Sequence, residues 1–402
     1  MDTPSIPALQ AQIDQVSADI ERQKELLKKL ERTKSLLQRQ LNDLRDPIAR
    51  LPLELSSDIF MQCLPAYLGP GSRIPRLFLK ICNSWTDIAL STPALWARMS
   101  FYLPRPRGFQ ELLKLWFQRS GGQPLHISVT GLMDDDVAAI VWESSSRLER
   151  LEFSAGEKDE TESGDSDESD SDSDSDDLES WDIWGSAQPR PLPLLQSLVI
   201  CGREDLKLES LPFVQLLRKS PNLSELILRD VEFDAGVGVD AEKLFLPNLR
   251  RLILDYDVKC DDNADEYDML TFISAPHLQT LGLSAEGTLY YDWRVNSFLH
   301  RSELRLQELI IKDDDTEDAD ELYDLLALVP TLTRLELEYP KPNIMGDLLS
   351  RLAETPSTIL PSLQTLRIPC LLSHFSGFPC TVKPGAHENH VPRHPPIHVR
   401  IA

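Results

Sequence analysis

Apolar residues in the first 44 positions recur every seven residues, in two interleaved series. One series occupies positions 6, 13, 20, 27, 34 and 41, the other positions 9, 16, 23, 30, 37 and 44, and only Lys34 and Gln23 among them are not apolar. Such a narrow stripe, on a segment otherwise rich in Glu, Lys, Arg and Gln, is typical of helices that bury a shared seam in a coiled coil. The pattern predicts one helix of about 60 Å. It should end near Asp46, because the residue before a proline is disfavoured in the α conformation.

A helix of this length gains too little from intrinsic propensity to persist in water, so the seam formed by these two series needs a partner. We expect self-association through residues 6–44, with a second copy or a related chain. The alternative is that the helix folds back on its own chain. Lys34 and Gln23 interrupt the seam, which weakens it and can fix its register.

A different pattern fills the second half of the chain. The phrase x-x-Leu-x-x-Leu-x-Leu, with Ile allowed last, recurs between residues 193 and 368 at intervals of 26 to 31 residues. The seven copies are PLLQSLVI (193), PNLSELIL (221), PNLRRLIL (247), PHLQTLGL (276), LRLQELII (304), PTLTRLEL (330) and PSLQTLRI (361), and an eighth, SRLERLEF, begins at 146. Each phrase predicts a short strand with alternating buried leucines, and intervening segments such as 211–220 and 320–329 have helical apolar spacing.

One strand and one helix per 26–31 residues resembles the leucine-rich repeat. The resemblance implies an α/β solenoid, an arc with parallel strands on its concave side, because a single repeat cannot cover its own apolar face. The asparagine position of that repeat family is not visible, so the likeness is to irregular variants. A helix, a Gly-Gly stop and a strand over 109–129, with a further helix over 137–145, place the start of the arc near residue 108.

Residues 46–97 predict three short helices. In the first, Pro52 occupies the first helical position and Glu54 the first turn, and Leu55, Ile59 and Cys63 follow at four-residue spacing, beside Phe60 and Leu64. The second carries Leu77, Phe78, Ile81, Cys82, Trp85, Ile88 and Ala89, and the third begins with Thr92 as its cap and Pro93 behind it, leading to Leu95 and Trp96. So few residues make a marginal core that leaves much apolar surface exposed.

LPLELSSDIFMQCLP followed by LKICNSWTDIALSTPALW resembles an F-box, whose pattern is Leu-Pro-x-Glu-Leu, an Ile-Phe step, a Leu, and later Cys-x-x-Trp with an apolar pair. The match covers residues 47–97. A heptad helix, this motif and then irregular leucine-rich repeats are similar in order to a group of F-box proteins from mushroom-forming fungi. The resemblance implies that the motif docks on the Skp adaptor of a Skp-Cullin-F-box ubiquitin ligase and that the repeats hold a protein substrate.

By position, the resemblance implies an adaptor-binding surface made of Leu51, Pro52, Leu55, Ile59, Phe60, Leu64, Trp85, Ile88 and Trp96, with Cys82 and Ala89 holding the helices together. An extended inter-helix loop at 65–76 departs from the common pattern and affects the docking angle of the second helix. The alternative is that these apolar residues are only the internal core of a helical cap on the repeats.

Four regions follow from these patterns. They are a coiled-coil helix at 5–45, an F-box-like three-helix domain at 46–98, a leucine-rich-repeat-like solenoid at 108–370 and an irregular Pro/His-rich tail at 371–402. An acidic insertion at 156–180 interrupts the repeats. Its core, 157–179, contains thirteen acidic residues and one lysine, so it cannot bury enough surface to fold and is expected to be disordered. Its Ser-Asp repeats resemble substrates of acidophilic kinases, and the alternative is a solubilising spacer.

The net charge of −24 argues against broad attraction to nucleic acid or anionic lipid. Two further carboxylate clusters, 255–268 and 313–321, follow strands of the repeat and predict an acidic rim that selects basic substrates; the alternative is that they only complement helix dipoles. No apolar run is long enough to cross a bilayer and the N-terminus lacks a signal-peptide layout, so we expect a cytoplasmic or nuclear protein.

Catalytic and metal motifs were also sought. Neither a Gly-x-Ser-x-Gly elbow nor a phosphate-binding Gly-rich loop is present, so no enzymatic activity is expected. The six cysteines are scattered without a Cys-x-x-Cys pair and are interpreted as thiols. Cys370, His374, Cys380 and His387 do not have the spacing of a recognised zinc site, so neither metal nor cofactor is predicted. Two functions remain: the ligase subunit, and a non-ligase scaffold oligomerised by its coiled coil.

Overall fold

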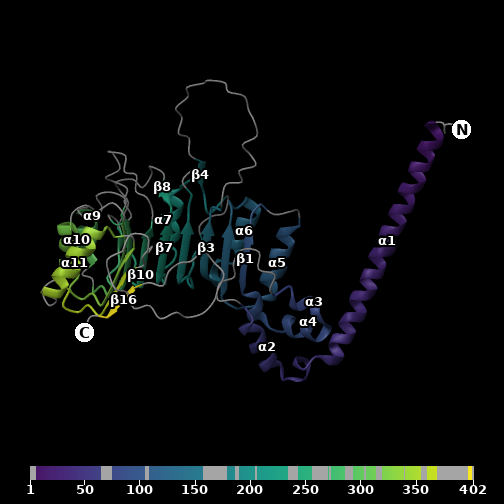
Figure 1. The fold of residues 1–402 in the computed structure, drawn as a ribbon, viewed down its shortest axis with the longest axis horizontal. Coiled ribbons are helices and arrows are strands. Elements are labelled where there is room, and N and C mark those ends of the chain that lie inside the picture. Colours follow the sequence, from purple (N-terminus) through teal and green to yellow (C-terminus); the bar gives the residue numbers. More distant parts are fainter. Residues whose placement is uncertain are drawn as a thin grey trace. The chain divides into compact units, whose positions relative to one another are not determined.

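The computed structural model describes most of the chain. The described residues are 6–64, 75–104, 108–156, 179–185, 190–203, 206–233, 243–255, 270, 273–285, 293–302, 305–313, 319–338, 340–354, 360–368 and 397–400. They form two compact units, one of residues 1–98 with 115–123 and one of residues 99–114 with 124–402. The fold is of mixed α/β class, with a long N-terminal helix followed by a mostly parallel sheet (Figure 1).

The first unit contains the predicted long helix and the small helical domain. Its elements are α1 (Ile6–Arg45), η1 (Ile48–Arg50), α2 (Leu53–Gln62), α3 (Phe78–Ile81), α4 (Asn83–Leu90) and η2 (Pro93–Trp96). The end of α1 at Arg45 confirms the predicted stop before Asp46. We call residues 46–64 and 75–97 the helical module.

The prediction of one continuous second helix in the module is wrong. The backbone at Cys82 is extended, with φ −157° and ψ 174°, and this residue separates α3 from α4. The third helix is a single 3₁₀ turn, and the hydroxyl of Thr92 does not cap it but donates to the carbonyl of Ile88 at 2.7 Å. Pro52 lies one position before α2, at its N-cap.

The second unit alternates strands and helices. Its helices are α6 (Asp135–Glu143), η3 (Ser145–Arg147), α7 (Ser210–Arg218), α9 (Trp293–Ser302), α10 (Ala319–Ala327) and α11 (Pro342–Glu354), and α5 (Phe109–Arg119) is divided between the units. Its main strands are β1 (Arg98–Tyr102), β2 (Leu125–Thr130), β3 (Leu148–Ser154), β5 (Ser197–Cys201), β7 (Glu225–Arg229), β10 (Arg251–Asp255), β12 (Thr280–Ala285), β13 (Glu308–Asp313), β14 (Arg334–Glu338), β15 (Thr365–Ile368) and β16 (Ile397–Arg400).

These eleven strands form one sheet in chain order. Pairing is parallel from β2 to β15, and the eight recurring phrases supply its strands from β3 onward. The last pair, β15 with β16, is antiparallel. Residues 397–400 therefore form a strand, although the sequence pattern placed them in an irregular tail.

The second leucine of each phrase forms the centre of the core. The members of this row are Leu151, Leu198, Leu226, Leu252, Leu281, Leu309, Leu335 and Leu366, and each is fully buried. Their alternation with polar neighbours explains the burial, since successive strand residues point to opposite faces. Hydrogen bonds link each repeat to the one before it just ahead of the strand; for example, Gln279 N donates to the carbonyl of Arg250 at 2.8 Å.

Short additional strands were not predicted. β4 (Glu179–Trp181), β6 (Leu206–Leu208) and β8 (Glu232–Phe233) form a three-stranded sheet, and β9 (Leu244–Phe245) pairs with β11 (Ile273–Ser274). The acidic core of the insertion at 157–178 and most of the tail lie outside the described residues, so the predictions for them stay predictions.

Candidate protein-interaction site

The helical module has an aromatic core. The ring of Phe60 on α2 lies 4.4 Å from that of Phe78 on α3 and 4.9 Å from that of Trp85 on α4, centroid to centroid. Phe60 is fully buried, as is Cys82 at the break between the helices. Aromatic pairs at these distances add to the free energy of burial, so three helices from two sequence segments are joined at one point.

Asp46 connects the module's polar groups. One oxygen of its carboxylate accepts a hydrogen bond from the backbone N–H of Ile48 at 2.9 Å, which caps η1. The other accepts the indole N–H of Trp85 and lies 3.8 Å from the thiol of Cys82. Sequence reasoning used Asp46 only to mark the end of the long helix, because nothing in the local pattern announces partners 36 and 39 positions away.

Hydroxyl and indole groups inside the module also find partners within it. Ser56 donates to the carbonyl of Pro52 at 3.2 Å, Ser57 and Thr92 share a hydrogen bond of 2.8 Å, and the indole of Trp96 donates to the carbonyl of Ala89 at 2.8 Å. Buried polar groups with partners do not oppose folding. The module's core is therefore closed without another protein.

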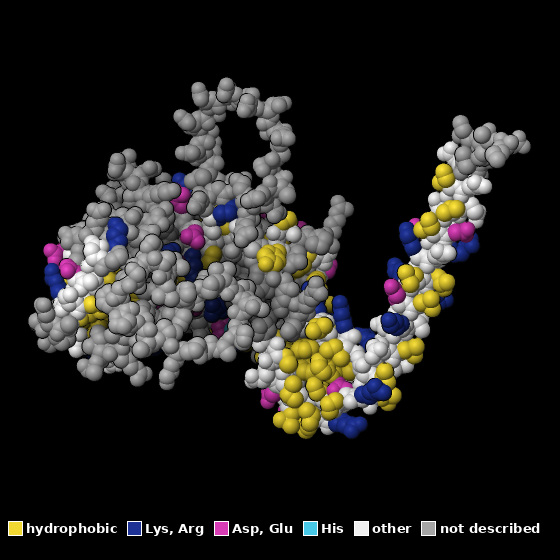
Figure 2. All heavy atoms as spheres, in the orientation of Figure 1, with side chains coloured by type: hydrophobic (Ala, Val, Ile, Leu, Met, Phe, Trp, Pro, Cys, Tyr) yellow, Lys and Arg dark blue, Asp and Glu magenta, His cyan; other side chains and the backbone are white. Residues whose placement is uncertain are grey.

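The outer surface of α2 is apolar. Leu51, Leu53, Leu55 and Ile59 are exposed, their exposed fractions running from 39% for Ile59 to 52% for Leu55. Hydrophobic side chains gather over this region in Figure 2. We call Leu51, Leu55 and Ile59 the apolar face; Leu53, about 160° from Leu55 around the helix axis, lies on another side of α2. Large exposed apolar clusters are typical of protein-interaction sites.

The structure divides the nine predicted site residues. Leu51, Pro52, Leu55 and Ile59 are exposed and Trp85 is half-buried. Phe60, Leu64, Ile88 and Trp96 are buried, which corrects their predicted place on the surface. Helical spacing explains the difference, because α2 turns Phe60 inward while its neighbour Ile59 points outward. Leu53 is also exposed, at the first residue of α2, and was not predicted.

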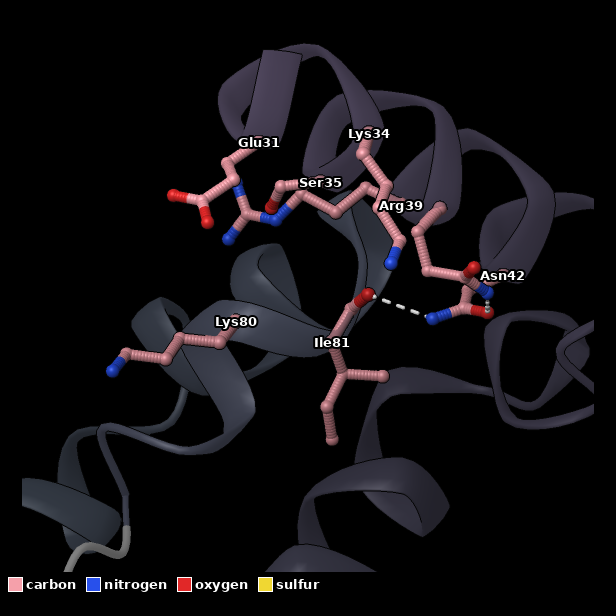
Figure 3. Close-up of a pocket in the computed structure, with 8 residues that line it drawn as sticks. Glu31, Lys34, Ser35, Arg39, Asn42, Lys80 and Ile81 are labelled. Carbon is pink, nitrogen blue, oxygen red and sulfur yellow. Dashed lines mark hydrogen bonds between the residues drawn. The ribbon is translucent and has the colours of Figure 1, made fainter. Parts of the chain in front are cut away.

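The C-terminal part of α1 contacts α3 through polar side chains. The guanidinium of Arg39 donates to the carbonyl of Leu79, and the amide of Asn42 donates to the carbonyl of Ile81 at 3.0 Å (Figure 3). These carbonyls belong to the end of α3. They have no intrahelical N–H partner because the helix is broken at Cys82. A pocket of about 280 Å³ lies beside the contact, lined by Glu31, Lys34, Ser35, Gln38, Arg39, Asn42, Lys80 and Ile81. The contact itself is structural, because Arg39 and Asn42 cap the end of α3.

In the second unit, the strand residues between the leucines form a second candidate surface. In register across the sheet, one row runs through Arg150, Ser197, Glu225, Arg251, Thr280, Glu308, Arg334 and Thr365. Two positions further along, Val199, Ile227, Ile253 and Ile310 form an apolar row, with Gly282 between the last two. This face combines a polar edge with an apolar centre.

The polar row is a chain of alternating charges. Glu225 lies 3.4 Å from Arg251 and accepts from the hydroxyl of Ser197 at 2.6 Å. Glu308 lies 3.1 Å from Arg334 and 3.7 Å from Arg251. A network of several charges is worth more than isolated surface pairs. In the sequence, this row is the residue before the second leucine of each phrase. When the repeats are aligned, the charged members of the row alternate between Arg and Glu.

The face is balanced in charge where it is described. Its cationic members are Arg150, Arg229, Arg251, Lys312, Arg334 and Arg367, and its anionic members are Glu152, Glu225, Asp255, Glu308, Glu336 and Glu338. The expected preference for basic substrates therefore depends on the carboxylate clusters 255–268 and 313–321, most of whose residues lie outside the described ranges.

Two ionisable groups at the far end of this face are perturbed. The hydrogen bond to Asp255, at 2.9 Å, raises the pKa of Lys312 above its usual value. Burial, and then the negative charges of Glu336 and Asp255, raise the pKa of the Glu338 carboxyl. Shifts of this kind belong to a structural charge network as readily as to a site.

The described residues contain no group of three or more His, Cys, Asp or Glu that could hold a metal ion. Cys370, His374, Cys380 and His387 lie outside them. Among the cysteines that the structure describes, Cys63, Cys82 and Cys201 form no disulfide. No described helix is both long enough and apolar enough to cross a bilayer.

Comparison of the chain with models of protein families and with curated protein sequences gives no match. The argument for function therefore depends on the two surfaces themselves.

Proposed function

We propose that the protein is the substrate-recognition subunit of a Skp-Cullin-F-box ubiquitin ligase. The helical module docks on the Skp adaptor through its apolar face, and the repeat unit binds a protein substrate. Catalysis belongs to other subunits of such an assembly. The receptor acts by raising the local concentration of its substrate near the loaded conjugating enzyme.

The apolar face carries this proposal. Leu51, Leu55 and Ile59 are exposed on a module whose own aromatic and polar groups already have partners. Full exposure of leucine or isoleucine to water costs roughly 1.5–3 kcal/mol each relative to burial, and about half of that applies to these side chains, which are 39–52% exposed. A partner that covers the face recovers that free energy, and Leu51-Pro52 with Glu54-Leu55 is the start of the F-box-like motif.

For substrate capture we infer that the parallel sheet belongs to a leucine-rich-repeat solenoid. Support comes from in-register phrases at 26–31-residue spacing and from hydrogen bonds that pass from repeat to repeat. The asparagines Asn222 and Asn248 act in this way, each donating to the carbonyl of a proline one repeat earlier, at 2.7 and 3.0 Å. The half-buried Ile253 and Ile310 beside the charged row suit a protein ligand that combines a hydrophobic anchor with a polar rim, whereas Val199 and Ile227 are buried.

Co-purification with a Skp adaptor tests the proposal. The full chain should capture the adaptor, and the double substitution Leu51→Ala with Pro52→Ala should abolish capture. Both residues are exposed, so the variant should retain the module's fold. Absence of capture by the unsubstituted chain would contradict the proposal.

The second candidate is a scaffold that does not meet an adaptor. The exposed seam of α1 favours it, since oligomerisation alone would give such a protein a function. The same experiment separates the two candidates, because the scaffold predicts no capture in either form.

A further inference from the structure

The seam of α1 is open along the helix. Its described members Ile13, Val16, Ile20, Leu27, Leu30, Leu37, Leu41 and Leu44 are all exposed. Figure 1 shows the N-terminal part of α1 as one uninterrupted helix beyond α3 and α4, and hydrophobic side chains follow it in Figure 2. The described side chains of the seam are therefore not covered by the other helices of the first unit.

The contact with the module uses a different side of α1. Arg39 and Asn42, which hold α3, belong to neither heptad series. Leu37 and Leu41, one turn away, stay exposed. Docking of the module and pairing of the seam are thus compatible on one helix.

We propose that α1 pairs with α1 of a second copy of this chain as a parallel, in-register, two-stranded coiled coil. The pairing does not depend on whether the module binds an adaptor. If it does, the dimer presents two modules and two repeat units, so that a substrate with two binding segments is held with increased avidity.

The residue types of the seam favour this arrangement. The series that begins at Ile6 has isoleucine at 13 and 20 and then leucine, lysine and leucine at 27, 34 and 41; the other series has leucine at 9, 30, 37 and 44, valine at 16 and glutamine at 23. β-Branched residues in the first position with leucine in the second, as at Ile6 and Leu9, favour parallel dimers, and a polar residue at one first position, here Lys34, specifies the register. In that register Gln23 faces Gln23 of the other copy, where two amides can hydrogen-bond across the seam.

The flanking charges agree with the parallel register. Asp19 just precedes seam position 20 and Lys24 just follows seam position 23, five residues apart, the spacing at which residues meet across a parallel pair. Within one chain they contact Arg22 at 3.3 Å and Glu21 at 2.8 Å. Exposed pairs of that kind contribute little to stability. An Asp19–Lys24 bridge between copies can replace them, and it forms twice in the dimer.

Adjacent leucines give a matched test of the seam. Leu37 lies on it and Leu36 does not, yet each is 61% exposed in the single chain. The full chain should have twice its 45.6 kDa mass by light scattering. Leu37→Glu should give the monomer mass, and Leu36→Glu should leave the dimer intact. A monomeric wild type, or a dimer that persists in Leu37→Glu, would overturn the proposal.

Orientation needs a second measurement. In a parallel, in-register pair, Ile13→Cys places two thiols opposite each other, so mild oxidation should link the copies covalently. Ala18→Cys, on the far side of the helix, should leave them unlinked above the background of the native cysteines. A dimer that Ile13→Cys does not link would refute the parallel register.

Discussion

The indole N–H of Trp85 donates to the carboxylate of Asp46, 39 positions earlier in the chain. The same carboxylate caps η1 through the amide of Ile48. The side chain of Asp46, the residue that follows α1, therefore bonds both to η1 and to α4. This arrangement explains how a module of three short helices keeps its shape while leaving leucines outside.

Replacing Asp46 should loosen the module. Asp46→Ala leaves the Trp85 indole and the Ile48 amide without their acceptor. An unsatisfied group costs about 1–3 kcal/mol when it is buried, and because these two groups are half-buried the cost should lie near the lower end. Amides of α2 should then exchange with deuterium roughly tenfold faster, since about 1.4 kcal/mol corresponds to that factor. Asp58→Ala, on the exposed side of α2, is the control and should leave exchange unchanged. Equal exchange in both variants would refute the role of Asp46.

Neighbouring residues of α2 should separate folding from binding. Phe60→Ala removes a fully buried ring and should cost about 3–5 kcal/mol, enough to unfold the module. Ile59→Ala truncates an exposed side chain and should change stability by at most about 0.5 kcal/mol while weakening adaptor capture. Amide exchange measured beside co-purification distinguishes the two effects. If Ile59→Ala unfolded the module, the assignment of an outer and an inner side to α2 would be wrong.

Two glycines of the second unit should respond in opposite directions to alanine. A Cβ on Gly202 would lie 2.1 Å from the carbonyl oxygen of Asp230, whose own φ is +47°, so Gly202→Ala should cost about 1–3 kcal/mol. Gly346 lies inside α11 with open space around it, so Gly346→Ala should stabilise the protein by up to about 1 kcal/mol. Denaturant unfolding measures both. Destabilisation by Gly346→Ala would contradict the helical assignment there.

Glu338 gives a pH-dependent prediction. Burial and two neighbouring carboxylates raise its pKa, so folding favours the protonated form. The stability that this proton contributes is present below the ordinary carboxyl pKa and is lost as the pH rises through the raised value. Glu338→Gln should therefore have a higher melting temperature than the wild type near neutral pH, and the difference should disappear in acid. Asp324→Asn, on the exposed side of α10, is the control. A difference in melting temperature that grew in acid would contradict a raised pKa of Glu338.

The periodic parts of the fold could be predicted from the sequence. The heptad spacing predicted α1 to its last residue, and the leucine phrases predicted every main strand from β3 to β15. In both cases burial of one face requires apolar residues at regular intervals, and these intervals are visible in the sequence. The break at Cys82 could not be predicted, because the apolar spacing continues through it. The carbonyls at the end of α3 are bonded instead by Arg39 and Asn42 of α1, which the sequence of α3 does not indicate.

The candidate surface was predicted only in part for a related reason. A pattern of apolar residues on a short helix does not say which side faces inward when both sides carry them. Phe60 and Ile59 are equally apolar, and only the rings of Phe78 and Trp85 decide that Phe60 is the buried one.

The affinity of the full chain for a purified Skp adaptor tests the central claim most directly. Leu55→Glu places a charge in the middle of the apolar face, and Leu211→Glu places one on α7 in the other unit, at a leucine that is 63% exposed against 52% for Leu55. By titration calorimetry, the wild type and Leu211→Glu should bind with the same dissociation constant, and Leu55→Glu should bind at least about a hundredfold more weakly, a loss of about 2.7 kcal/mol. Equal binding by all three proteins, or none by the wild type, would contradict adaptor docking on the apolar face.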